Sequence, residues 1–144
     1  MGEREESVAR AFVSAWCGEE YGEAEIARQL DFLSDDIRFH VYAWERPVVG
    51  RDAVREELVR QTEMGIGGIR SEILTMASVD KTVFLERTDS MTFRGKPFTM
   101  HVAAVGEVNA EGKISAWREY YDSREISVRL GTDAGTSGSR GYDT

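Results

Sequence analysis

The sequence contains a single cysteine, Cys17, among its 144 residues. One thiol excludes a disulfide within the chain and fits a reducing compartment. Cys17 stands near the end of an expected helix with no base beside it, which argues against a nucleophilic thiol. The first ten residues are charged, unlike the apolar core of a secretory signal. Together these features predict a cytoplasmic protein.

Basic runs and long apolar runs are missing as well. Acidic residues outnumber lysine and arginine by 26 to 18, which gives a net charge of −8 at pH 7. Nucleic acids and anionic membranes attract basic patches, so neither is expected as a partner. No window approaches the ~18–20 apolar residues that a membrane span requires. The 41% of hydrophobic residues is enough for a real core, and the length fits one domain.

Hydrophobic periodicity predicts helices in the first half of the chain and strands in the second. The third helix is expected to open with Asp52 as its N-cap, after a loop at 46–50. Turn-like segments at 94–97 and 109–113 predict antiparallel pairing of the last strands. The expected helices are 4–17, 23–33 and 52–64, and the expected strands are 37–43, 69–77, 83–93, 98–108 and 114–122.

This order of elements predicts an α+β fold in one domain, residues 1–128. Three N-terminal helices cover one face of a curved antiparallel or mixed sheet, which forms a cone whose mouth can hold a small molecule. Residues 129–144 are rich in glycine and serine and are expected to be a disordered tail.

The strand at 83–93 breaks the rule that a buried face is apolar. Side chains alternate between the two faces of a strand. Arg87 and Asp89 therefore fall on the face that otherwise carries apolar side chains such as Leu85 and Met91. Buried charge is costly unless it is paired, so both residues need partners.

The last strand offers a third charged group, Glu119, on the face that also carries Trp117 and Tyr121. If this face shares the interior with Arg87 and Asp89, the pocket holds an acid, an arginine and a second acid. An arginine can bridge two carboxylates, and paired acids can serve as general base and general acid. The alternative is a structural cluster of ion pairs.

Other polar side chains are weaker candidates. His101 shares a strand face with Ala103 and Val105, where small side chains leave room for a ligand, but a lone histidine on such a face is more often a core residue than a catalyst. His40 and Tyr42 point to one face of their strand, toward either the pocket or solvent. Trp117 is core or pocket wall. Two distant histidines without nearby ligands at metal spacing argue against a metal site.

Two segments resemble the limonene-1,2-epoxide hydrolase-like family. They are residues 85–89 (Leu-Glu-Arg-Thr-Asp) and 112–122 (Gly-Lys-Ile-Ser-Ala-Trp-Arg-Glu-Tyr-Tyr-Asp). Residues 50–54, which open the third helix, are typical of the wider nuclear transport factor 2-like superfamily, with its SnoaL-like polyketide cyclases and its ketosteroid isomerases. The resemblance spans about residues 5–127 and implies a cone-shaped α+β barrel without a cofactor. It also implies a homodimer, since members of the family commonly form dimers.

The resemblance also implies residue roles in one-step opening of a small apolar epoxide. Arg87 would bridge the acids, Asp89 would protonate the epoxide oxygen, and Glu119 would activate a water, although the family has aspartate at that position. The family holds its water with Tyr-x-Asn on the first strand, where this chain has residues 39–42 (Phe-His-Val-Tyr).

Two registers follow from that difference. Either Phe39 and Val41 face the pocket and the water site is lost, or His40 and Tyr42 replace it. Without an anchored water, a hydroxyl group of the substrate can attack instead, and the protein would be an epoxide-opening cyclase or isomerase of a polyketide-like intermediate. A non-catalytic domain that binds a small molecule is the third reading.

Overall fold

The computed structural model describes residues 2–125. The expected tail, 129–144, lies outside these residues. Each expected helix and strand is present, with ends that differ by a few residues. The helices are α1 (Glu3–Ala15), α2 (Glu23–Leu30) and α3 (Arg51–Met64), and the strands are β1 (Leu33–His40), β2 (Val48–Val49), β3 (Ile66–Val79), β4 (Thr82–Phe93), β5 (Lys96–Val108) and β6 (Ile114–Tyr120).

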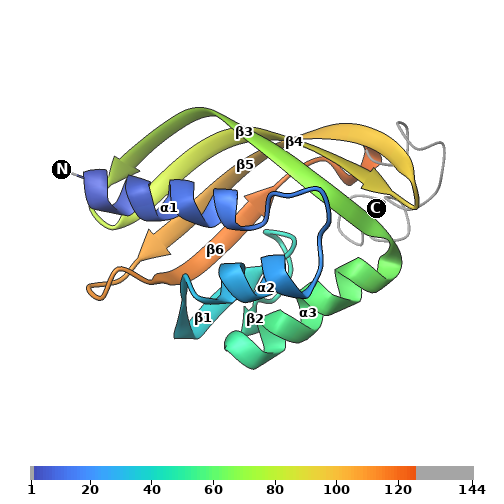
Figure 1. Ribbon diagram of the computed structural model, residues 1–144. Helices are drawn as coiled ribbons and strands as arrows, with labels where there is room; N and C mark the ends of the chain where they lie inside the picture. The colour runs from blue at the N-terminus through green and yellow to red at the C-terminus, as the bar shows by residue number, and fades with distance from the viewer. Residues whose placement is uncertain (1, 126–144) are drawn as a thin grey trace.

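The strands form one six-stranded sheet in the order β2-β1-β6-β5-β4-β3. β1 runs parallel to β6, and every other neighbouring pair is antiparallel, as the turn-like segments predict. Figure 1 shows α1 crossing the long strands on one face, while α2 and α3 lie beside β1 and β2. The α+β fold with helices on a curved mixed sheet is therefore confirmed, and the sheet is not closed into a full barrel.

Three local expectations are wrong. Residues 34–36 were expected to separate a helix from a strand, but they lie inside β1, where Asp35 and Asp36 are exposed to solvent. Val48–Val49 was expected in a loop and instead pairs with β1 as β2. The N-cap of α3 is Gly50 rather than Asp52; its φ of 92° is a conformation that glycine adopts without strain.

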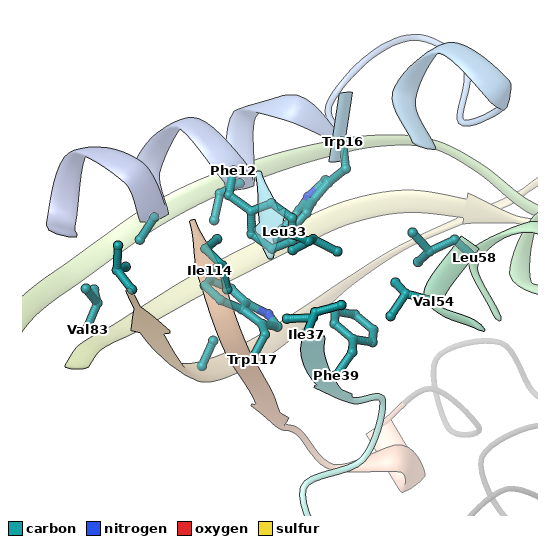
Figure 2. Close-up of a cluster of buried hydrophobic side chains, with 14 of the residues drawn as sticks. Phe12, Trp16, Leu33, Ile37, Phe39, Val54, Leu58, Val83, Ile114 and Trp117 are labelled. Carbon is teal, nitrogen blue, oxygen red and sulfur yellow. The ribbon is translucent and has the colours of Figure 1, made fainter. Parts of the chain in front are cut away.

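Aromatic side chains from distant elements form the centre of the core. Phe12 of α1 and Trp16, the C-cap of that helix, lie over Trp117 of β6, and the ring centroids of Phe12 and Trp117 are 4.8 Å apart in an edge-to-face arrangement. Ile37 of β1 and Leu58 of α3 extend this cluster toward the helices (Figure 2). The core thus fixes β6 against α1, and it fixes the end of β6 that carries Glu119.

Among residues 2–125, no helix has both the length and the apolar character needed to cross a membrane.

Gly106 of β5 is required by the close approach of Trp117. A methyl group at this position would lie 2.7 Å and 2.8 Å from two atoms of the Trp117 ring, which is fully buried and cannot move aside. We expect Gly106→Ala to lower the free energy of unfolding by about 1–3 kcal/mol, the usual cost of overpacking a core. Urea unfolding followed by tryptophan fluorescence measures this change.

The matched control is Gly22→Ala, because a methyl group there meets nothing closer than 4.0 Å. Its cost should stay below about 1 kcal/mol, as for a modest change at a helix N-cap. Equal losses in both variants would contradict the role given to the Trp117 contact.

Candidate active site

A cavity of about 220 Å³ lies between the covered face of the sheet and the helices. Its wall contains Arg87, Asp89 and Glu119, so the three charged residues predicted from the sequence share one interior space. Much of the remaining wall is apolar and includes Leu58, Ile66, Ile69, Met91, Phe93, Phe98 and Met100. A cavity with a few convergent polar groups in an apolar wall is typical of a small-molecule site.

Arg87 and Asp89 form a two-point ion pair along β4. The Nε and Nη2 groups of Arg87 donate to Oδ1 and Oδ2 of Asp89 at 2.9 and 3.0 Å. Both residues are buried, with exposed fractions of 2% and 5%. Ser71 of β3 also donates to Oδ1 of Asp89, at 2.6 Å. Asp89 Oδ1 therefore accepts two hydrogen bonds, and Oδ2 accepts one.

The same arginine reaches the second acid. Nη2 of Arg87 donates to Oε2 of Glu119 at 2.7 Å, and Nε1 of Trp117 donates to that oxygen at 3.0 Å. No donor between residues 2 and 125 reaches the other oxygen, Oε1 of Glu119. Glu119 is thus held through Oε2 while Oε1 stays available to a bound molecule. This arrangement is the acid–arginine–acid bridge predicted from the sequence.

The surroundings of Arg87 preserve its charge. Burial lowers the pKa of the guanidinium, but the carboxylates of Glu119 and Asp89 raise it by more, and the net shift is upward. The guanidinium also lies over the Trp16 ring, 4.7 Å from its centroid. Nη1 of Arg87 has no hydrogen-bond acceptor among the described residues. Arg87 therefore binds and orients both acids and does not exchange protons.

Tyrosines surround Glu119. Burial raises the pKa of the Tyr121 hydroxyl well above its usual value, and a hydrogen bond with Tyr42 and the charge of Glu119 raise it further. Burial also raises the pKa of Tyr21, partly offset by its hydrogen bond with Gln29, and the Glu119 charge adds to the rise. These hydroxyls stay protonated near neutral pH and can act as hydrogen-bond donors.

The structure does not bring every predicted site residue to the cavity. His101 lies on the opposite face of β5, where its side chain is 60% exposed and Nδ1 is 3.3 Å from a Glu125 oxygen. The expected pocket face of β5, with Ala103 and Val105, is therefore wrong; Phe98 and Met100 line the cavity instead. His40 is also outside the lining, because its Nδ1 lies 3.0 Å from the Glu45 carbonyl oxygen.

The register of the first strand is resolved in favour of its apolar face. Phe39 and Val41 line the cavity, so this strand offers no polar pair for a water. Tyr42, just beyond the end of β1, lines it too and stacks near Tyr121, with ring centroids 5.4 Å apart. Trp117 is fully buried and reaches the site only through its hydrogen bond to Glu119.

Sequence reasoning missed three polar residues at the site, Tyr21, Gln29 and Ser71. Gln29 could have been found, because it lies three residues after Ile26 on the buried face of α2, where a polar side chain is unexpected. Ser71 supports Asp89 and in turn accepts a hydrogen bond from Nε1 of Trp16 at 2.8 Å. No sequence pattern links Trp16 to that strand.

Within residues 2–125, no three histidine, cysteine, aspartate or glutamate side chains are grouped as ligands for a metal ion.

The SnoaL-like domain family model matches residues 9–117. The chain belongs to this family. Its fold is the NTF2-like fold, as the resemblance predicts. An NTF2-like protein from Anabaena variabilis is similar at 27% identity and a TM-score of 0.69, over 82% of this chain and 89% of that one. The NTF2-like fold binds small molecules, and its members include both enzymes and non-catalytic proteins.

Two further solved structures share the SnoaL-like fold at lower identity. An LEH-like epoxide hydrolase from M. tuberculosis has 21% identity and a TM-score of 0.70, over 94% of this chain and 89% of that one. A protein with a ketosteroid isomerase-like fold from Catenulispora acidiphila, in complex with trimethylamine, has 19% identity and a TM-score of 0.74, over 88% and 94%. At these identities the similarity establishes the fold alone.

Two buried tyrosines should ionise late in an alkaline titration. The pKa values of Tyr21 and Tyr121 are raised in the folded state, so the stability they contribute is complete below their unfolded pKa of about 10 and is lost as the pH rises above it. Absorbance at 295 nm should show a delayed step, and Tyr21→Phe and Tyr121→Phe should each reduce it by one residue.

The control is Tyr120→Phe, since that side chain is half exposed on the outer face. It should leave the delayed step at its wild-type size. Ionisation of all tyrosines in one step, with the protein still folded by circular dichroism, would show that the environment of Tyr21 and Tyr121 is misassigned.

Proposed function

We propose that this protein is an epoxide hydrolase that opens a small apolar epoxide by one-step acid–base catalysis. The observation that carries the proposal is the bridge from Asp89 through Arg87 to Glu119 in the wall of a largely apolar pocket. Arg87 and Asp89 are buried, and the side chain of Glu119 is 19% exposed. Such a cluster of buried ion pairs adds little to stability, so a catalytic use accounts for it better than a structural one.

Glu119 is assigned as the general base. Its Oε2 is occupied by Arg87 and Trp117, and its free Oε1 can take a proton from a nucleophilic oxygen in the cavity. That oxygen forms a bond to one epoxide carbon while the bond from this carbon to the epoxide oxygen breaks. Holding the base and the epoxide in one pocket supplies the proximity that such a step needs.

Asp89 is assigned as the general acid, which donates its proton to the epoxide oxygen as the ring opens. Oδ2 is the oxygen that would carry this proton, because Oδ1 already accepts from both Ser71 and Arg87. After the step Glu119 holds a proton and Asp89 has lost one. Transfer of one proton between the acids through solvent then restores the starting state, with Arg87 charged throughout.

The second candidate is an epoxide-opening cyclase or isomerase acting on a polyketide-like intermediate. The observation that favours it is the apolar wall formed by Phe39 and Val41, because no polar pair on β1 holds a water there. In that reaction a hydroxyl group of the substrate replaces water, and the acids keep their roles.

The predictions that the protein is cytoplasmic and forms a homodimer remain predictions from the sequence and the family resemblance.

We expect Glu119→Gln and Asp89→Asn to lower kcat for limonene oxide or cyclohexene oxide by about 10²–10⁴-fold, the usual contribution of a general acid or base. Product formation is measured by gas chromatography, with the melting temperature as a check on folding. The matched control is Glu86→Gln, on the exposed face of the same strand, which should retain wild-type turnover. Full turnover in both active-site variants would refute the assignment.

Isotope labelling separates hydrolase from cyclase. In water enriched in ¹⁸O, the hydrolase should incorporate one label into a diol, because water is the nucleophile. A cyclase given an apolar epoxy alcohol should form an unlabelled cyclic ether, since the substrate hydroxyl attacks. Mass spectrometry of the products decides between them. If neither class of compound reacts, the protein is a non-catalytic member of its family.

A further inference from the structure

Gln29 places a carboxamide on the buried face of α2. The residue is only 4% exposed, and its neighbour on that face is the buried apolar side chain of Ile26. It lines the same cavity as the acid–arginine–acid bridge. A buried amide costs free energy unless its polar atoms find partners. A buried carboxamide at this position therefore calls for a structural or functional explanation.

Only half of that carboxamide has a partner among the described residues. Tyr21 donates to Oε1 of Gln29 at 2.5 Å, and this bond fixes which end of the amide points to the tyrosine. No acceptor between residues 2 and 125 takes a hydrogen bond from Nε2 of Gln29. The amide nitrogen is thus an oriented donor at the edge of a cavity, with no acceptor among the described residues.

The Tyr21–Gln29 pair lies near the proposed base. Burial raises the pKa of the Tyr21 hydroxyl, and the negative charge of Glu119 raises it further. Both members of the pair line the cavity together with Glu119. The α1–α2 loop that carries Tyr21 is also held to the sheet, because Gly18 donates its backbone N–H to the carbonyl oxygen of Ile69 at 3.0 Å.

We infer that the Gln29 carboxamide, oriented by Tyr21, binds the attacking oxygen, whether this belongs to a water or to a hydroxyl group of the ligand. This inference rests on the proposed function and assigns the nucleophile's binding site, which β1 does not provide. Nε2 of Gln29 donates to one lone pair of that oxygen, and Oε1 of Glu119 accepts its proton. A second lone pair remains for attack on the epoxide carbon.

Binding of an oxygen can be tested without any turnover. Cyclohexanol and chlorocyclohexane are similar in size, but only the alcohol can both accept a hydrogen bond from Gln29 and donate one to Glu119. The ratio of their dissociation constants, measured by NMR titration, reports recognition of the hydroxyl group. Gln29→Leu should reduce the preference for the alcohol about 5–10-fold, the effect of one net hydrogen bond.

Gln61→Leu is the matched control, because that amide also lines the cavity but already donates to Glu57 at 3.2 Å. It should keep the wild-type ratio. Tyr21→Phe should give an intermediate ratio, since the amide remains but loses its orientation. An unchanged ratio in Gln29→Leu would overturn the inference.

Kinetics with cyclohexene oxide give a second, separate readout. Gln29→Leu should lower kcat about 10–100-fold with little change in KM, because apolar walls bind the epoxide and the amide positions only the attacking oxygen. A rise in KM at constant kcat would instead place the amide on the substrate's own epoxide oxygen and overturn the assignment. If wild-type protein opens no epoxide, the proposed function fails, while the alcohol ratio still decides whether Gln29 binds an oxygen.

Discussion

The buried guanidinium of Arg87 is the constraint on which the rest of the site depends. An arginine so far from water is stable only with carboxylates at hydrogen-bond distance, and two are present at 2.7–3.0 Å. Each carboxylate needs further donors, which Ser71 and Trp117 supply. The positive charge of Arg87 on β4 therefore accounts for the hydrogen-bond donors Ser71 on β3 and Trp117 on β6.

The aromatic core supports this polar cluster as much as it supports the fold. Trp16 stacks on the Arg87 guanidinium and donates to Ser71, while Trp117 donates to Glu119. The rings of both tryptophans pack against Phe12 of α1. A shift of α1 would therefore disturb both acids together, which links the packing of the first helix to the chemistry at the far strands.

Alternation along single strands predicted which strand face carries each member of the bridge, but not how the strands pair. It set Arg87 and Asp89 on one face and Glu119 beside Trp117, and the family pattern then joined the two. His101 was expected on the pocket face of β5, but it lies on the outer face. Residues that pair directly across two strands point to the same side of the sheet, and the short turn between β4 and β5 pairs His101 with outward-facing Thr88. The turn places Phe93 opposite Lys96, and counting residues back from that pair would have predicted the face of His101.

Helical spacing could have revealed Gln29 as a buried polar residue, but not its place beside the acids, because that place depends on how α2 packs rather than on strand alternation. Phe39 of β1 and Val41 just after it form an apolar wall, so polar contacts to a bound oxygen must come from another part of the chain. Gln29 of α2 and Tyr21 before it are polar groups of the described chain that reach this space. The strands thus hold the acids rigidly in the sheet, and α2, whose preceding loop is held to that sheet at Gly18, completes the site.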